Sequence, residues 1–210
     1  MTKTRVMIVD DQQLARQLFN LYIEGSGRYE VVKLAETAAF AEATVSAVPV
    51  DLIVMDILMK DESNGLEAAA AIKKLHPDIK ILAVTSMAEA SWLKTARAAG
   101  IESFWYKDSS QETILEVMDR TMAGESVYPD SPPVIRIGFC NNTELTEREL
   151  DVLRYMTKGL ANSVIAKKLN VSENTVKTHI QHMLNKTGFE NRTELAIEAR
   201  LSGVAVSLEK

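Results

Sequence analysis

The sequence predicts a doubly wound α/β domain with a five-stranded parallel sheet, followed by a separate all-α domain of four helices. Through the first 125 residues, five short apolar runs alternate with helix-like segments. Near-continuous apolar runs are typical of strands that are covered on both faces, as in parallel sheets. After residue 142 only helix-like periodicity is found. We therefore place a first domain at residues 1–125, a linker at 126–142 and a second domain at 143–210.

The elements of the first domain follow from these runs and from the residues that interrupt them. Strands are expected at residues 5–9, 29–34, 51–55, 79–84 and 103–106, and helices at 12–24, 37–46, 66–75 and 89–99. A fifth helix should begin at the capping-box pattern Ser109-x-x-Glu112 and end at Gly124. The first helix carries an apolar stripe at helical spacing, made of Leu14, Leu18, Leu21 and Tyr22.

The linker and the second domain show different local signals. Residues 128–133 include three prolines, which resist helix formation, and we expect an irregular linker. Downstream, helices are expected at residues 146–158, 162–169, 173–187 and 193–201. Thr146-x-x-Glu149 is a second capping-box pattern, and Gly159 and Gly188 are suitable helix ends.

Composition narrows the class of protein. The chain has 210 residues, 46% of them hydrophobic, and a net charge of -5. Its single cysteine, Cys140, excludes an internal disulfide and a cysteine-cluster metal site. No apolar run has the length of a signal-peptide core or a membrane span, so we expect a cytoplasmic protein that does not engage a membrane. Residues 152–192 hold seven basic and two acidic residues, which indicates that the second domain meets a polyanion.

Polar side chains follow four of the expected strands directly. They are Asp10 and Asp11, then Asp56, Thr85 and Lys107. Ligands of parallel α/β sheets bind outside the carboxyl ends of the strands, so these side chains should meet at one edge. Any one of them alone is commonly a turn or cap residue. The ordered set predicts a site for Mg²⁺ and a phosphoryl group.

Each residue of this set has a chemical role. Mg²⁺ prefers hard oxygen ligands and retains several waters, so we expect Asp11 and Asp56 to bind it directly. Asp10 would act through its charge and a bound water, and the Leu58 backbone carbonyl could add a ligand. Asp56 is the natural nucleophile toward phosphorus once Mg²⁺ lowers the repulsion between the anions. Lys107 and Thr85 would bind the phosphoryl oxygens.

Residues 1–125 resemble the receiver domain of two-component response regulators. The resemblance is carried by Val9-Asp10-Asp11, residues 51–56, Val84-Thr85-Ser86 and Tyr106-Lys107. It implies a flavodoxin-like (βα)5 fold and phosphoryl transfer from the phosphohistidine of a histidine kinase to Asp56. It also implies a switch in which Thr85 follows the phosphoryl group and Phe104 changes its packing.

The sequence departs from the common receiver pattern near the site. Lys60 stands where many receivers have proline, and the loop from Asp56 to Gly65 is one residue longer. Asp108 follows Lys107 where a proline, often in cis, is frequent. Leu58 and Met87 should flank the line of attack on phosphorus, and neither side chain orients a water. We therefore predict slow self-dephosphorylation.

The helices at residues 162–169 and 173–187, joined by a tight turn, predict a helix-turn-helix. The exposed face of the second helix should carry Lys177, Thr178, Gln181, His182 and Lys186. Ser172 and Thr175, near its start, could bind phosphates beside the backbone amides. His179 and His182 have no acidic or cysteine partner at metal-ligand spacing, so we do not expect a metal there.

Residues 143–201 resemble the LuxR-type DNA-binding domain, and with the receiver they mark the NarL/FixJ type of response regulator. The motifs are residues 145–149, 159–162, 165–166, 171–179 and 191–194, with Lys186 and Gly188. The resemblance implies base contacts by Lys177, Thr178 and Gln181. It also implies dimerisation through the last helix, where we expect Leu195 and Ala199 to lie in the interface. A homodimer should form on phosphorylation.

Three alternative functions are considered for this sequence. A Mg²⁺-dependent phosphatase would carry a second aspartate two residues after the nucleophile, but Leu58 occupies that position. A transcription factor controlled by a small molecule would not need this set of charges. A receiver with an intact site that works through protein partners, without phosphate, stays open.

Overall fold

The computed structural model describes residues 2–59, 63–108, 110 and 112–206. By its internal contacts the chain divides into two compact units. The first unit comprises Met1–Ser86 with Ser91–Asp130, and the second comprises Met87–Ala90 with Ser131–Lys210.

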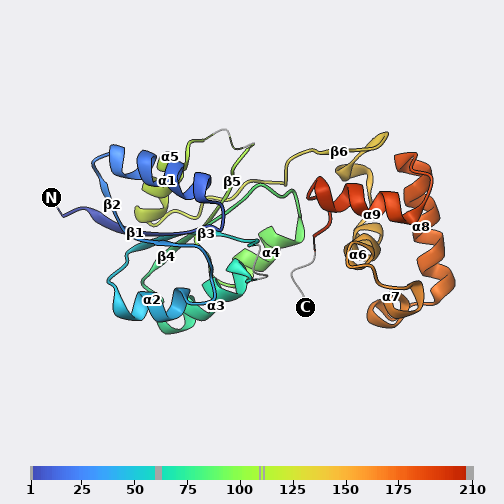
Figure 1. The fold of residues 1–210 in the computed structure, drawn as a ribbon, viewed down its shortest axis with the longest axis horizontal. Coiled ribbons are helices and arrows are strands. Elements are labelled where there is room, and N and C mark those ends of the chain that lie inside the picture. Colours follow the sequence, from blue (N-terminus) through green and yellow to red (C-terminus); the bar gives the residue numbers. More distant parts are fainter. Residues whose placement is uncertain (1, 60–62, 109, 111, 207–210) are drawn as a thin grey trace. The chain divides into compact units, whose positions relative to one another are not determined.

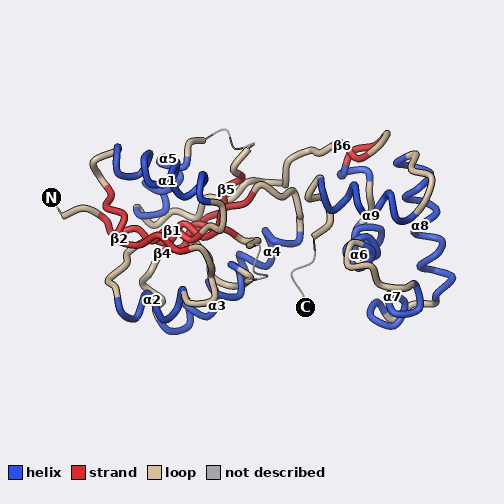
Figure 2. The backbone as a smooth tube through the Cα atoms, viewed as in Figure 1, coloured by secondary structure: helices blue, strands red, loops and turns tan. Residues whose placement is uncertain are grey.

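The first unit is built on a five-stranded parallel sheet in the order β2-β1-β3-β4-β5. The strands are β1 (Thr4–Val9), β2 (Tyr29–Ala35), β3 (Leu52–Asp56), β4 (Lys80–Thr85) and β5 (Ser103–Tyr106). The central strands are buried on both faces, as their continuous apolar runs predict. This strand order is that of a doubly wound flavodoxin-like fold and confirms the predicted fold class. Figure 2 shows the strands as the middle layer of this unit.

Helices cover both faces of the sheet (Figure 1). On one face lie α1 (Gln13–Gly25) and α5 (Ile114–Met122), which bury Phe19, Ile23 and Met118 against Ile8 and Val54 of the strands. On the other face lie α2 (Ala41–Ala47), α3 (Gly65–Leu75) and α4 (Ser91–Ala98).

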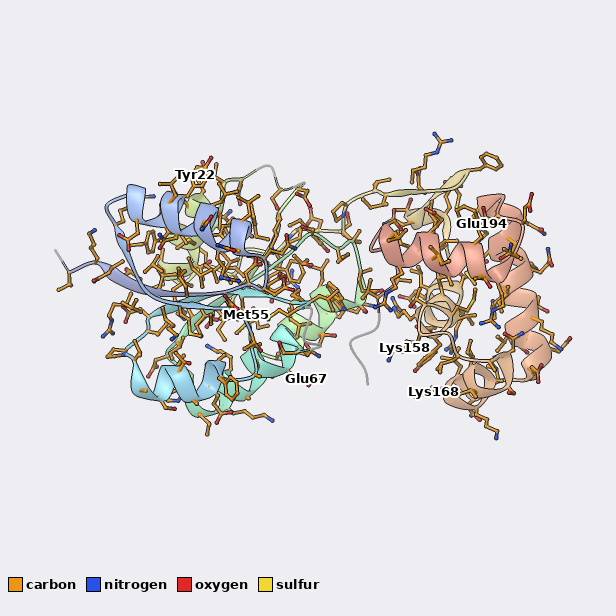
Figure 3. All side chains as sticks on the ribbon, in the orientation of Figure 1. Tyr22, Met55, Glu67, Lys158, Lys168 and Glu194 are labelled. Atoms are coloured by element: carbon orange, nitrogen blue, oxygen red, sulfur yellow. The ribbon has the colours of Figure 1, made fainter. Side chains whose placement is uncertain are left out.

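The apolar stripe of α1 does not face the sheet. Leu14, Leu18, Leu21 and Tyr22 are 46–69% exposed, whereas the buried residues of the helix are Arg16, Phe19 and Ile23. In Figure 3, Tyr22 lies on the outer side of α1 and Met55 lies within the sheet layer. The stripe therefore predicted the helix correctly but not its buried face.

Two helix starts differ from the prediction by about one helical turn. Helix α2 begins at Ala41, four residues later than expected. Helix α5 is capped by Thr113, whose hydroxyl accepts from the Glu116 N–H while the Glu116 carboxylate accepts from Thr113. The capping box is thus one helical turn later than the predicted Ser109 pattern. Ser109 itself, like Lys60, lies outside the described residues.

The second unit contains four helices among its described residues, preceded by a short hairpin. The helices are α6 (Glu147–Met156), α7 (Asn162–Leu169), α8 (Glu173–Thr187) and α9 (Arg192–Leu201), which confirms the predicted set. The hairpin pairs β6 (Arg136–Ile137) with β7 (Cys140–Asn141), and a 3-10 turn, η1 (Asn142–Glu144), follows. Our expectation of an irregular segment through residue 142 is wrong here. Gly138, at φ +60, makes the turn, and Ile137 and Cys140 are buried in the core of the unit.

Candidate functional site

Three carboxylates meet at the carboxyl edge of the sheet. Asp10 and Asp11 follow β1, and Asp56 ends the adjacent parallel strand β3. Each offers an oxygen within 4.8 Å of the others, and Asp10 and Asp56 are buried while Asp11 is half-exposed. Three hard oxygen donors at one partly open edge fit a divalent cation such as Mg²⁺, which needs only one or two carboxylates.

Lys107 joins two of these carboxylates. Its Nζ lies 2.7 Å from Asp10 Oδ2 and 2.9 Å from Asp56 Oδ2, and its side chain is 12% exposed. The Lys107 backbone N–H donates to the Thr85 carbonyl, which fixes the residue at the end of β5. Burial alone would lower the pKa of Lys107, but Asp56 and Asp10 together raise it above its usual value. The ammonium therefore stays charged.

Burial has the opposite consequence for Asp56. It raises the pKa of Asp56 to about 6, and the neighbouring Asp10 charge adds to the rise. Lys107 and a backbone N–H lower that pKa in part. The carboxylate is thus ionised near neutral pH, yet it is poorly solvated. An ionised and poorly solvated carboxylate is suited to act as a nucleophile.

Both carboxylate oxygens of Asp10 have partners within the protein. Oδ1 accepts the Gln12 backbone N–H at 2.8 Å, and Oδ2 accepts from Lys107. These partners favour a role for Asp10 through its charge rather than as a direct metal ligand. Its charge still contributes to the site.

Thr85 and Phe104, the other predicted residues of the receiver site, are almost fully buried on β4 and β5. Thr85 is 1% exposed and lies one residue beyond Val84, which pairs with Asp56. Phe104 is 1% exposed, and its ring lies 5.1 Å from the ring of Tyr106. The structure therefore brings Thr85 to the same sheet edge as Asp56. Thr85 pairs with Tyr106 of β5, and Phe104 lies two residues before Tyr106.

Sequence reasoning missed Arg16. This buried arginine of α1 donates to the Asp10 carbonyl oxygen at 2.6 Å and to Glu36 Oε1 at 2.7 Å. It holds the backbone from which Asp10 and Asp11 extend. Arg16 precedes Phe19 and Ile23 by three and seven residues, so all three lie on the same, buried face of α1. This spacing was the sequence signal that could have indicated a buried arginine.

Sequence reasoning also missed the role of Gly65, the first residue of α3. A Cβ at this position would lie 1.9 Å from the backbone oxygen of Asp56. The Gly65 N–H also donates to the Ile57 carbonyl. Only glycine permits this close approach, so Gly65 allows the start of α3 to lie against the end of β3, where Asp56 is.

In the second unit, α7 and α8 form the predicted helix-turn-helix. Asn170 makes the turn at φ 53, and Ser172 caps α8 by accepting the Thr175 N–H. The two hydroxyls of Ser172 and Thr175 also lie 2.8 Å apart. Along α8, Lys177, Thr178 and Gln181 are exposed at positions that share one face of the helix.

Lys186 has a different environment from these residues. Its Nζ lies 2.7 Å from the buried Glu149 Oε2 and 3.0 Å from the Glu144 carbonyl oxygen. Burial acts to raise the pKa of Glu149, but Lys186 and the capping residue Thr146 lower it overall. The ammonium of Lys186 therefore joins α8 to the start of α6.

The expected interface residues of the last helix are in the core. Leu195 and Ala199 are each 0% exposed and pack with Leu153 and Met183. Fully buried side chains cannot present a surface to a partner, so our assignment of these two residues is wrong. The exposed apolar residues of α9 are Ile197 and Leu201, at 53% and 73%.

Comparisons with known proteins agree with both halves of this description. The response regulator receiver domain family matches residues 6–119, and the bacterial regulatory proteins of the luxR family match residues 143–199. Response regulator protein VraR of Staphylococcus aureus is 34% identical over 200 residues, which cover 93% of this chain and 95% of VraR.

Solved structures share the fold. The structure of two RcsB dimers bound to two parallel DNAs matches with a TM-score of 0.62 at 21% identity, over 97% of this chain and all of that one. A CheY-like receiver domain protein from Methanospirillum hungatei matches with a TM-score of 0.54 at 26% identity, over 59% of this chain and 96% of its own.

The chain thus belongs to the DNA-binding response regulators, in which a receiver domain precedes a LuxR-type helix-turn-helix domain. Proteins of this class are transcription regulators rather than classical enzymes. Among the residues described by the structure, no helix has the length and apolar content to cross a bilayer.

Proposed function

We propose that this response regulator accepts a phosphoryl group on Asp56 from a histidine kinase and thereby controls its dimerisation and its target genes. The observation that carries the proposal is the convergence of Asp10, Asp11, Asp56 and Lys107 at one sheet edge. Membership of the response regulator family supports a kinase partner and a dimer. The three carboxylates support a requirement for Mg²⁺.

For phosphoryl transfer the protein mainly has to position the reacting groups. One Asp56 oxygen forms a bond to phosphorus while the bond from phosphorus to the imidazole nitrogen of the kinase breaks, and that nitrogen keeps the electron pair. Asp11, Asp56 and the Leu58 carbonyl would hold Mg²⁺, which when bound neutralises charge on the phosphoryl oxygens. Lys107 would then exchange its carboxylate partners for a phosphoryl oxygen, and Thr85 would donate its hydroxyl to another.

The DNA-binding half would place α8 in the major groove. Lys177, Thr178 and Gln181 share an exposed face and would reach base edges. Ser172 and Thr175, at the start of α8, would contact phosphates. Lys186 supports the helix from within the unit, so any contribution it makes to phosphate binding should be secondary.

Loss of the phosphoryl group should be slow. Leu58 lies two residues beyond Asp56 and has no polar atom in its side chain to orient an attacking water. We expect an acyl phosphate that survives well beyond seconds in the purified chain, and its release is measured as free phosphate.

Phosphorylation with acetyl phosphate and Mg²⁺ tests the proposal. Wild-type protein should gain one phosphoryl group in an intact mass measurement, and Asp56→Asn should gain none. Asp78→Asn, a change of the same kind at an exposed loop position, is the matched control and should behave as wild type. Uptake by Asp56→Asn would refute the assignment. An unphosphorylatable variant that still regulates normally would instead favour control through protein partners.

A further inference from the structure

The segment that follows α5 runs along the open edge of the sheet. We call residues 126–128 the exit segment, because they lie just before the end of the first unit at Asp130. The Phe104 N–H donates to the Val127 carbonyl at 2.9 Å, and the Val127 N–H donates to Ser103 Oγ at 3.1 Å. Ser126 Oγ donates to the Glu102 carbonyl. The edge of β5 is therefore covered by the chain itself.

Tyr128 fixes the end of this segment. Its hydroxyl donates to the Ile101 carbonyl at 2.8 Å, and the Arg97 guanidinium of α4 lies 3.9 Å from the centre of its ring. The Phe104 ring lies 6.0 Å from the Tyr128 ring. One half-buried side chain thus contacts β5, the turn before β5, and α4.

These contacts extend a row of aromatic rings toward the phosphoryl site. Tyr106 pairs with Thr85 and precedes Lys107, and its ring lies 5.1 Å from that of Phe104. Phe104 in turn contacts Tyr128. Phe104 is 1% exposed in a close-packed interior, so it cannot change its rotamer without displacing a neighbouring ring. Rearrangement at Thr85 and Lys107 would therefore reach the exit segment.

We propose that Tyr128 is a latch that is closed while Lys107 binds Asp10 and Asp56, and that repacking of Phe104 upon phosphorylation releases it. The proposal rests on the proposed function, because it needs a phosphoryl group at Asp56. Release would free residues 126–130 and add these five residues, about 17 Å when fully extended, to the tether between the two units. A longer tether changes the effective concentration at which two DNA-binding units meet.

The proposal predicts a reciprocal effect. If the phosphorylated state favours an open latch, opening the latch by mutation must favour the phosphorylated state by the same factor. We would titrate the full chain, in Mg²⁺, with beryllofluoride as a phosphoryl mimic, and follow tryptophan fluorescence. Tyr128→Ala should raise the affinity about 5-fold or more. Tyr128→Phe, which keeps the ring and loses only the hydrogen bond to Ile101, should raise it about 2-fold.

Tyr22→Ala is the matched control, because Tyr22 is 61% exposed on α1 and lies outside the aromatic row. It should leave the affinity unchanged. Tyr128→Phe also serves if Tyr128→Ala fails to fold. Affinities of both Tyr128 variants that equal or fall below that of wild type overturn the latch but leave phosphorylation at Asp56 intact. A wild-type chain that binds no beryllofluoride overturns the proposed function and the latch together.

Discussion

The ammonium of Lys107 lies 2.9 Å from Oδ2 of Asp56, in a site where both side chains are largely buried. Lys107 lowers the pKa of Asp56 and so opposes the effect of burial. Lys107→Ala should therefore move the pKa of Asp56 further above about 6. The midpoint of acetyl phosphate labelling against pH reports this change, and it should move to higher pH. A midpoint that stays in place would mean that Lys107 does not interact with the ionised Asp56.

The raised pKa of Asp56 has a consequence for stability. The folded-state pKa, about 6, exceeds the ordinary value of 3.8, so the stability linked to protonation is present below about pH 4 and is lost as the pH rises through 6. Asp56→Asn removes the buried charge. It should raise the free energy of unfolding at pH 8 by about 1–3 kcal/mol, in the absence of Mg²⁺.

Urea unfolding at pH 8 and at pH 4 measures this difference. The gain of the variant over wild type should shrink toward zero at pH 4, and saturating Mg²⁺ should also reduce it by stabilising wild type. A variant that is less stable than wild type at pH 8 would contradict the assigned electrostatics.

Gly65→Ala should disturb the phosphoryl site, although Gly65 contributes no side chain to it. The added Cβ would lie 1.9 Å from the Asp56 backbone oxygen, so the start of α3 or the end of β3 must move. We expect a loss of about 1–3 kcal/mol in stability and slower phosphorylation. Gly25→Ala is the matched control, because among the described residues beyond its own helix no atom lies within 4 Å of a Cβ placed there, and its φ is not positive. Equal effects of the two changes would mean that the approach of Gly65 to Asp56 is unimportant.

Arg16 should matter for metal binding as well as for stability. Arg16→Ala removes the donor that holds the Asp10 carbonyl and leaves that carbonyl without this buried partner. We expect weaker Mg²⁺ binding, measured by tryptophan fluorescence, and a loss of about 1–3 kcal/mol in stability. Glu36→Gln, which alters only the exposed partner of Arg16, should have little effect on either. Unchanged Mg²⁺ affinity in Arg16→Ala would limit Arg16 to a structural role.

Two lysines of α8 should separate DNA recognition from folding. Lys177→Ala should reduce discrimination among DNA sites by about 1–3 kcal/mol and leave the melting temperature unchanged, because the side chain is exposed. Lys186→Met should lower the melting temperature, because it leaves the buried Glu149 carboxylate without its cation. Competition binding to related DNA duplexes and thermal unfolding distinguish the two. The reverse pattern would exchange their roles.

The site was predictable because strand ends in a parallel sheet meet at one edge. Asp10, Asp56 and Lys107 each follow an apolar run, and that topology alone brings them together. Arg16 and Gly65 act on backbone atoms of the site. The motifs of the phosphoryl site do not specify a residue at either position. Their contacts with the site can be identified only from the packing of α1 and α3 against the strands.

The errors arise where packing, rather than periodicity, decides the outcome. Periodicity detects a helix but does not say which face meets the sheet. Leu14 and Leu21 belong to the apolar stripe of α1, yet they lie on its exposed side. Leu195 was assigned to a dimer interface on the family resemblance of the last helix, whereas its side chain is in the core. The hairpin around Gly138 has strands too short to carry an alternating pattern.

DNA affinity measured before and after complete phosphorylation tests the central claim most directly. Wild-type protein, treated with acetyl phosphate and Mg²⁺, should bind a target duplex more tightly and sediment as a dimer, and Asp56→Asn should show neither change. Equal DNA affinity and equal mass in solution, with phosphate demonstrably on Asp56, would contradict the account.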